Sequence, residues 1–227
     1  MVESGSAHDP GDARIISYLT LRKAVGYLGI LLPFVLAIGN LVIFSGGLQQ
    51  SVSDYFYTGM RGVLVGGLCV IGAFLGAYQG YDRWDGLFTN AAGIGAVGVA
   101  LFPTAPDHPS FRATVVGYFH YAFGAVMFIA LAVIALWLFR KTGPDPGPTP
   151  HKQLRNRIYL ICGIVMVVSL TLAGIASLPF ASGLSSLDPV FWLEAATIAA
   201  FGVSWLVKGQ AMLRDDQPLP GRPLLHA

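Results

Sequence analysis

Apolar residues in this chain of 227 residues gather into six long runs, separated by short polar segments. A helix that crosses the hydrocarbon of a bilayer takes about 20 apolar residues, and each run is close to that length. The pattern therefore predicts an all-α protein, a polytopic membrane bundle of six transmembrane helices. The predicted spans cover residues 24–44, 59–79, 86–102, 113–139, 158–180 and 189–207.

Composition supports this class of protein. Hydrophobic residues make up 54% of the chain and charged residues 11%, whereas soluble proteins carry about 25% charged residues. Mean hydropathy is +0.63. Because so apolar a chain cannot hide its surface in one core in water, the lipid bilayer is its expected partner. The net charge of +2 gives no reason to expect a nucleic-acid partner.

Basic residues lie almost entirely on one side of the predicted layout. Of the 14 Lys and Arg residues, only Arg61 and Arg112 fall on the side opposite the N-terminus. Short cytoplasmic loops are enriched in Lys and Arg, so we expect both termini in the cytoplasm, N-in and C-in. The basic residues on the predicted cytoplasmic side are Arg14, Arg22, Lys23, Arg83, Arg140, Lys141, Lys152, Arg155, Arg157, Lys208, Arg214 and Arg222.

The ends of the chain are predicted to lie outside the bundle. Residues 1–20 begin with acidic residues where a signal peptide would carry basic ones, so we expect a flexible cytoplasmic tail there. The bundle itself should cover residues 21–210, and residues 211–227 should form a second cytoplasmic tail. The proline-dense segment 141–150 is predicted to be a stiff linker that separates four helices from two.

Glycines recur at intervals of four in the second predicted span. Gly62 and Gly66 form one such pair, and Gly72, Gly76 and Gly80 continue the spacing. Small residues at this interval let two membrane helices approach closely. We expect the second and third spans to pack against each other, and the alternative is contact between copies in a homo-oligomer.

Asn40, His120 and Glu194 fall inside predicted spans, all in the half opposite the termini. At 1.5 Å per residue, Asn40 lies about 6 Å from the end of its span at residue 44, Glu194 about 8 Å from the start of its span at residue 189, and His120 about 12 Å from Arg112. Such residues are costly in hydrocarbon and usually face the bundle interior. Asp54 and Arg61 flank the end of the second span that lies on this side, opposite the termini. The candidate ligand-binding residues are Asn40, Asp54, Arg61, His120, Glu194 and Thr197.

The helical register supports convergence of these side chains. His120 shares a face with Gly117 and Gly124, so that face should touch another helix closely. Glu194 and Thr197 begin a polar stripe that continues through Ser204 and Lys208, which favours the bundle interior.

Several strings identify the chain more specifically. They are Ser51–Arg61 (SVSDYFYTGMR), Gly80–Asp82 (GYD), Val99–Thr104 (VALFPT), Gly117–His120 (GYFH) and Phe201–Gly209 (FGVSWLVKG). Together they resemble a family of bacterial multi-pass membrane proteins of unknown function, over nearly the whole chain. The resemblance implies the bacterial cytoplasmic (inner) membrane and no established reaction. A Ser/Asp segment before the second span and an intramembrane His are also remotely similar to alkaline-ceramidase-like membrane hydrolases.

The expected function is to bind or sense a lipid headgroup or small molecule in a polar pocket that faces the extracytoplasmic side. One alternative is a membrane-embedded hydrolase that uses Asp54, His120 and Glu194, and another is a proton-coupled transporter that uses Glu194 and His120. These residues can instead form a hydrogen-bond network that only fixes helix register. Catalytic zinc takes three protein ligands, and His120 would need His108 to join it, so we expect no metal and no cofactor.

Overall fold

The computed structural model describes residues 10–78, 80, 82–106, 108–141, 150–178, 183 and 186–209, with side chains described from residue 19 onward. The first nine residues of the predicted N-terminal tail, most of the proline-dense linker and the predicted C-terminal tail 211–227 lie outside the described residues.

The described part of the chain is all-helical and contains no strand. Two short 3-10 helices, η1 (Ser53–Tyr57) and η2 (Leu138–Arg140), accompany six α-helices. The α-helices are α1 (Pro10–Ile43), α2 (Arg61–Gly76), α3 (Arg83–Leu101), α4 (Phe111–Leu136), α5 (Pro150–Ala176) and α6 (Pro189–Lys208).

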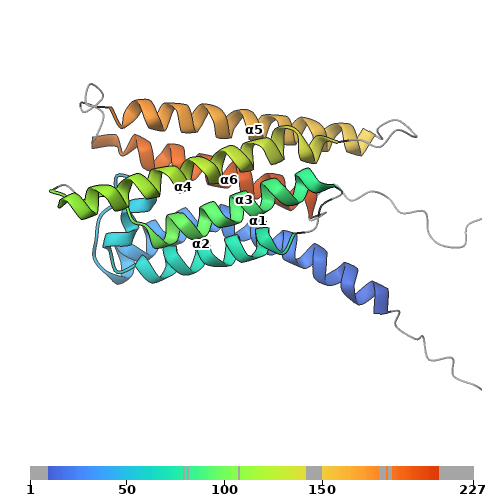
Figure 1. Cartoon of the computed structure of the whole chain (residues 1–227), viewed down its shortest axis with the longest axis horizontal. Helices are drawn as coiled ribbons and strands as arrows, with labels where there is room; N and C mark the ends of the chain where they lie inside the picture. The colour runs from blue at the N-terminus through green and yellow to red at the C-terminus, as the bar shows by residue number, and fades with distance from the viewer. Residues whose placement is uncertain are drawn as a thin grey trace, which may run out of the picture.

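The six helices lie side by side and alternate in direction along the bundle (Figure 1). Each packs against its neighbour in sequence, and α6 packs against α1, so the helices form a closed ring. Consequently the loop that carries η1 and the start of α6 lie at one end of the bundle, the η1 end. The start of α3 and the end of α6 lie at the other, which we call the α6-C end.

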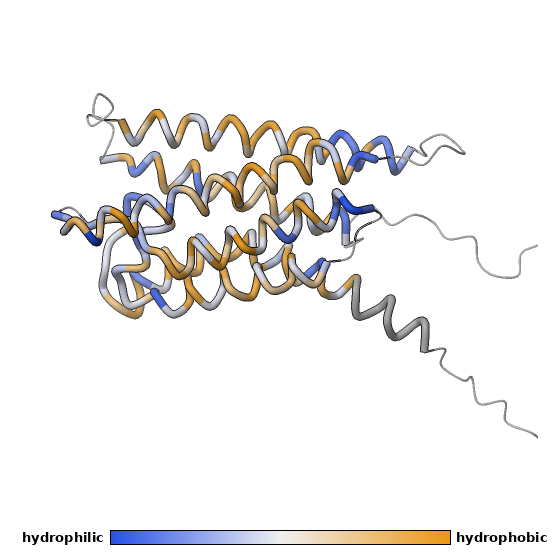
Figure 2. The backbone as a smooth tube through the Cα atoms, in the orientation of Figure 1, coloured by the Kyte–Doolittle hydropathy of each residue, from blue (hydrophilic) through white to orange (hydrophobic). Residues whose placement is uncertain are grey.

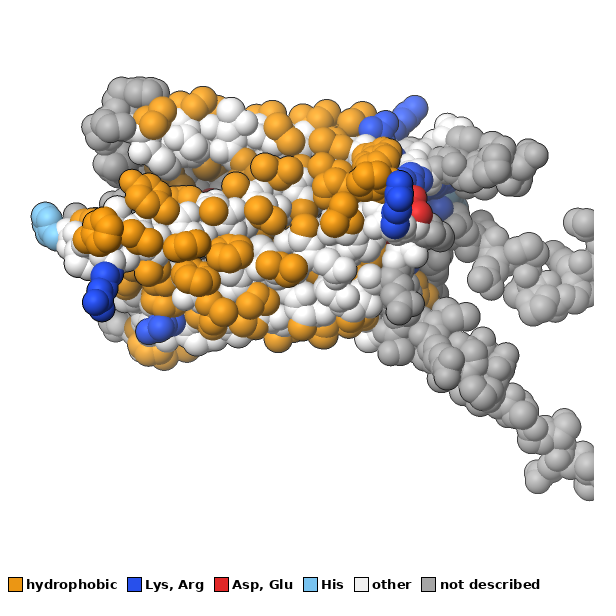
Figure 3. Space-filling view, viewed as in Figure 1, with side chains coloured by type: hydrophobic (Ala, Val, Ile, Leu, Met, Phe, Trp, Pro, Cys, Tyr) orange, Lys and Arg blue, Asp and Glu red, His pale blue; other side chains and the backbone are white. Residues whose placement is uncertain are grey.

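Four helices are long and apolar enough to cross a membrane: residues 19–43 of α1, α4 with η2, α5 and α6. They indicate an integral membrane protein. Helix α2 is apolar but has 16 residues, and α3 contains Arg83, Asp85 and Asn90, whose polar side chains lower its hydropathy. Hydrophobic residues fill the middle of the helices, and hydrophilic residues lie mostly toward the helix ends (Figure 2). The visible lateral surface is covered with hydrophobic side chains, and Lys and Arg stand near its ends (Figure 3).

Two helices begin earlier than the hydropathy pattern predicts. Helix α1 starts at Pro10, inside the segment predicted to be a flexible tail, and α5 starts at Pro150 rather than at residue 158. Proline is favoured in the first turn of a helix, and residues 13–21 contain no Gly or Pro that would interrupt α1. Hydropathy locates the apolar part of a helix, whereas the helix itself continues into polar residues.

The turn before α3 is held by side-chain caps. The Asp82 carboxylate accepts hydrogen bonds from the backbone N–H groups of Trp84 and Asp85, and the Asp85 carboxylate accepts one from the N–H of Asp82. Lys141 donates to Asp82 at 2.6 Å. That hydrogen bond holds the pKa of the Asp82 carboxyl below its ordinary value.

Close approach of α2 and α3 depends on only part of the glycine pattern. A Cβ built at Gly72 would lie 2.8 Å from the carbonyl oxygen of Gly93, and one built at Gly93 would lie 2.7 Å from the carbonyl oxygen of Gly72. By contrast, no described atom beyond their own helix backbone and chain neighbours lies within 4 Å of a Cβ at Gly62 or Gly66. The predicted packing of the two spans is therefore confirmed at Gly72, and it does not extend to Gly62 and Gly66.

We predict that Gly72→Ala destabilises the protein and that Gly66→Ala does not. The methyl group at residue 72 would push on the backbone of α3, and overpacking of this kind costs about 1–3 kcal/mol. At residue 66 the methyl group has room, and alanine is the better helix former. Thermal unfolding of both purified variants in the same detergent measures the difference. Equal stability of the two variants would contradict the close contact of Gly72 with Gly93.

Candidate functional site

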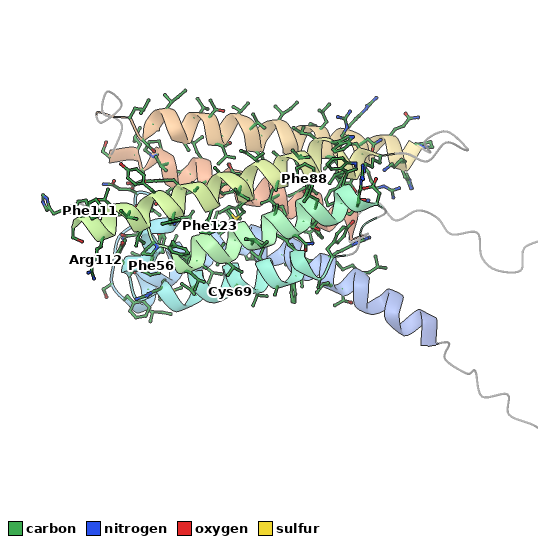
Figure 4. The ribbon with its side chains drawn as sticks, in the orientation of Figure 1. Phe56, Cys69, Phe88, Phe111, Arg112 and Phe123 are labelled. Atoms are coloured by element: carbon green, nitrogen blue, oxygen red, sulfur yellow. The ribbon has the colours of Figure 1, made fainter. Side chains whose placement is uncertain are left out.

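The loop between α1 and α2 crosses the η1 end of the bundle and is anchored there by an aromatic residue. Tyr55, in η1, is 0% exposed, and its ring packs against Phe191 of α6 with centroids 6.1 Å apart. The Tyr55 hydroxyl accepts a hydrogen bond from the backbone N–H of Gln49 at 3.4 Å. Phe56, of the same short helix, is labelled at this end of the bundle together with Arg112 at the start of α4 (Figure 4).

His120 of α4 holds the loop from one side. It is 7% exposed, and its Nδ1 lies 2.7 Å from the carbonyl oxygen of Phe102. Because a carbonyl oxygen only accepts, Nδ1 carries the proton. In the neutral ring Nε2 is then an acceptor, and the Ser53 hydroxyl stands 3.1 Å from it as the donor. The tautomer of His120 is thus set by the chain segment that follows α3.

The glycine face of α4 around His120 makes the close contact with neighbouring residues that the helical register predicts. A Cβ at Gly117 would lie 3.1 Å from the Cβ and the backbone nitrogen of Ala105, and one at Gly124 would lie 3.8 Å from Val99. This face of α4 therefore packs against α3 and the residues after it, which brings the imidazole next to Phe102. The absence of side chains at the two glycines allows that approach.

Glu194 of α6 holds the loop from the other side. Its Oε2 accepts a hydrogen bond from the backbone N–H of Val52 at 2.7 Å. Val52 precedes Ser53, so the carboxylate and the imidazole bind adjacent residues of one segment. Asp54 follows, and its charge acts on both Glu194 and His120.

Further contacts fasten the segment to the residues after α3. The Thr104 hydroxyl donates to the Asp54 carboxylate at 3.3 Å, and the Tyr57 hydroxyl donates to the Thr104 carbonyl oxygen. The backbone N–H of Asp54 donates to the Ser51 hydroxyl at 3.1 Å. Residues 51–57 therefore form a cap that is bound to α4, to α6 and to the segment after α3.

Burial raises the pKa of Tyr55 and of Tyr57, the two tyrosines of this cap, above the ordinary value of 10.0. A neighbouring carboxylate raises each pKa further: Asp188 acts on Tyr55, and Asp54 acts on Tyr57. Both phenols therefore stay protonated well above neutral pH. The hydrogen bonds that they make do not change as the pH varies around 7.

The other predicted site residues have different partners. The Asn40 amide donates to the carbonyl oxygen of Gly47 at 2.9 Å, which fixes the first residues of the loop. The Arg61 guanidinium lies over the ring of Phe56 at 4.0 Å. Thr197 is buried in the bundle, as the polar stripe predicts, and its hydroxyl donates to the carbonyl oxygen of Leu193 in its own helix. The structure thus brings Asp54, His120 and Glu194 together around one segment, and it gives Asn40, Arg61 and Thr197 separate contacts.

Sequence reasoning assigned no role to Ser53 or to the acceptor at Phe102. Ser53 stands in the string SVSD ahead of the second span, and a hydroxyl in a polar segment beside a membrane span is the signal that could have drawn attention to it. The carbonyl of Phe102 has no such signal, because any residue carries one.

Metal ligation has no geometric support in the described part of the chain, where no three His, Cys, Asp or Glu side chains come together as a group that could hold a metal ion. His108 is exposed. Cys69 and Cys162 are free thiols.

We predict that Glu194→Ala lowers the stability of the protein more than Glu194→Gln does. Alanine leaves the buried N–H of Val52 without an acceptor, which costs about 1–3 kcal/mol, whereas the glutamine side chain keeps a carbonyl oxygen in the same place. Thermal unfolding of the two variants and the parent protein in one detergent measures this. If both variants lost the same stability, the contact with Val52 would not be what Glu194 contributes.

Comparisons of the chain with known protein families, with curated proteins and with solved structures find no match.

Proposed function

We propose that this membrane protein hydrolyses an acyl ester at the η1 end of the bundle, with Ser53 as the nucleophile and His120 as its general base. One observation carries the proposal: the neutral imidazole turns its unprotonated Nε2 to the Ser53 hydroxyl at 3.1 Å, while Nδ1 is held by the Phe102 carbonyl oxygen. A hydroxyl next to a base that a third group orients is the arrangement that activates a serine.

The reaction balances with water as the only co-reactant. Ser53 Oγ attacks the acyl carbon as its proton passes to His120 Nε2, and the alcohol leaves with that proton. Water, deprotonated by the same nitrogen, then cleaves the acyl-serine, and the acid is released. The Phe102 carbonyl oxygen accepts from Nδ1–H and keeps Nε2 turned toward Ser53 in each step.

A lipid ester is the substrate class that the surroundings favour. A groove of about 490 Å³ opens between α1 and α2 beside the cap. Its walls are apolar, and Gly59 and Met60, at the end of the loop, contribute to it together with Val35 and Ile38 of α1. An acyl chain fits such walls, and the chain would enter from the bilayer without leaving hydrocarbon.

Ligand binding or sensing is the second candidate function. It is supported by the contact between the Glu194 carboxylate and the backbone N–H of Val52. A cationic or hydroxyl-bearing headgroup would replace that amide as the partner of the carboxylate and release the cap. Proton-coupled transport through Glu194 and His120 stays a prediction.

We also propose six membrane spans, with both termini in the cytoplasm of a bacterial cell and the η1 end facing outward. The alternating helices support an even number of crossings. The basic residues support the orientation with both termini in the cytoplasm, because all Lys and Arg residues except Arg61 and Arg112 fall on the side of the termini.

We predict that a fluorophosphonate probe labels the purified protein at Ser53. Ser53→Ala should abolish labelling, and His120→Asn should slow it by about 100-fold or more, the contribution of a general base. Labelling is followed by in-gel fluorescence, and the modified residue is identified by peptide mass spectrometry.

The matched control for this experiment is Ser186→Ala, which removes an exposed hydroxyl before α6, at the same end of the bundle. It should label like the parent protein. A parent protein that the probe does not modify, together with a Ser53→Ala variant that loses stability, would show that the hydroxyl and the imidazole only fasten the cap.

We predict that the loop at the η1 end is reached from outside the cell. In a protein with Cys69→Ala and Cys162→Ala, an impermeant maleimide should label Gln50→Cys in intact cells. Gln153→Cys, at the start of α5, should be labelled only after the membrane is opened. Labelling of Gln153→Cys in intact cells would reverse the proposed orientation.

A further inference from the structure

A groove of about 480 Å³ lies between α2 and α3. Cys69, which lines it, is labelled on α2 in the stick view (Figure 4). The other residues of α2 that line the groove are Gly72, Ala73 and Gly76, so this wall consists of small residues throughout. On the side of α3, Asn90 brings a polar side chain to the groove. The groove opens at the lateral surface of the bundle, because Ala73, Gly76 and Asn90 are exposed.

The groove wall of α2 differs from the exposed faces of α1 and α5. Those faces carry large apolar side chains, such as Leu41 of α1, which is 64% exposed, and Ile161 of α5, which is 60% exposed. Along α2, by contrast, Ala73 and Gly76 are exposed at the groove, and the exposed Gly66 continues the same stripe toward the η1 end. Contact with lipid does not require small residues, whereas surfaces on which a second membrane helix packs are enriched in them.

The Asn90 side chain has no hydrogen-bond partner among the residues that the structure describes. A Cβ built at Gly76 would lie 3.9 Å from its Oδ1, so the amide faces α2 across the groove. Asn90 lies about two turns, or about 10 Å, from Arg83, the first residue of α3. An amide with free donors and a free acceptor therefore stands well inside this helix, at the open side of the groove.

Lipid offers no partner to an amide at this depth. Headgroups remain at the bilayer surface, and hydrocarbon neither donates nor accepts hydrogen bonds. The backbone groups of a neighbouring helix are paired within that helix, so the partner that can reach Asn90 is a polar side chain of another membrane helix. The depth of Asn90 rests on the proposed crossing of the bilayer by α3, and it is independent of the proposed hydrolysis.

We propose that the groove between α2 and α3 is the interface of a homodimer, in which the Asn90 amides of the two copies hydrogen-bond to each other. A two-fold axis along the membrane normal brings the same residue of both copies to the same depth. A carboxamide carries donors and an acceptor, so two such groups satisfy each other. The small residues of α2 let the helices of the second copy approach closely enough for that contact.

Thiol cross-linking in native membranes tests the proposal with a matched pair of residues. Ile94 lines the groove one turn after Asn90 and is 65% exposed, and Ile161 of α5 is 60% exposed. In the full chain with Cys69→Ala and Cys162→Ala, a short bifunctional maleimide should link Ile94→Cys into dimers and leave Ile161→Cys monomeric. Equal cross-linking of these two variants, or no cross-linking of Ile94→Cys, would overturn the proposal.

Energy transfer between fluorescently labelled copies of the full chain in liposomes measures the dissociation constant of the dimer and tests the role of the amide. Asn90→Leu should weaken the dimer about tenfold, as expected for the loss of a hydrogen bond between membrane helices. Asn90→Gln keeps a carboxamide and should weaken the dimer less. Equal losses for the leucine and glutamine variants would contradict the proposed contact between the amides.

The same measurement tests the role of the small residues. Ala73→Leu fills the groove and should weaken the dimer about tenfold or more, because overpacking holds the two copies apart. Ala125→Leu, at an exposed alanine of α4, should leave the dissociation constant unchanged, and equal effects of the two variants would contradict the interface. A parent protein that stays monomeric would overturn the proposal, and a lipid that co-purifies with it would then be the occupant of the groove. Labelling of Ser53 is measured separately, so the dimer and the proposed hydrolysis fail independently.

Discussion

Polar groups within the hydrocarbon of a membrane have to find their partners inside the protein, because lipid offers none. The η1 end of the bundle is built on this constraint. Glu194 and His120 are held at depth in α6 and α4, and the chain brings residues 51–57 across the bundle to meet them. The backbone N–H of Val52 and the hydroxyl of Ser53 are what these two side chains require. The position of the cap, and of any chemistry in it, follows from that requirement.

The same constraint fixes the tautomer and the orientation of the His120 imidazole. A histidine in water exchanges freely between tautomers, whereas His120 is fixed by the carbonyl oxygen of Phe102. Nε2 is thereby left as an acceptor, and a serine hydroxyl in the cap meets it. This geometry of His120 and Ser53 suits a hydrogen-bond network that only holds the loop, and it equally suits a pair in which the imidazole activates the hydroxyl. What separates them is whether an electrophile is attacked at Ser53.

The opposite end of the bundle, the α6-C end, carries positively charged side chains that contact buried aromatic rings. There, Arg22 of α1 lies over the ring of Tyr78 and Lys208 of α6 lies over the ring of Phe139. Positive charge at this side of a membrane protein usually serves topology. The ring contacts of Arg22 and Lys208 also fasten α1 and the end of α6 to the aromatic side chains buried at this end of the bundle.

Much of the fold is determined by the sequence alone. The apolar runs locate all six helices, and the glycine face of α4 correctly predicts a close contact with another helix, which the structure identifies as α3. The pattern does not show where α1 and α5 begin, because a helix continues into polar residues that hydropathy leaves out. Of the site, the sequence identifies His120 and Glu194 as costly polar residues in the same half of the predicted bundle, and Asp54 as a residue that flanks the second span on that side. Only the tertiary structure decides that they meet one segment, that Asn40 and Thr197 are satisfied elsewhere, and that Ser53 faces the imidazole. These outcomes depend on backbone carbonyls and amides, which every residue carries and which no sequence pattern can distinguish.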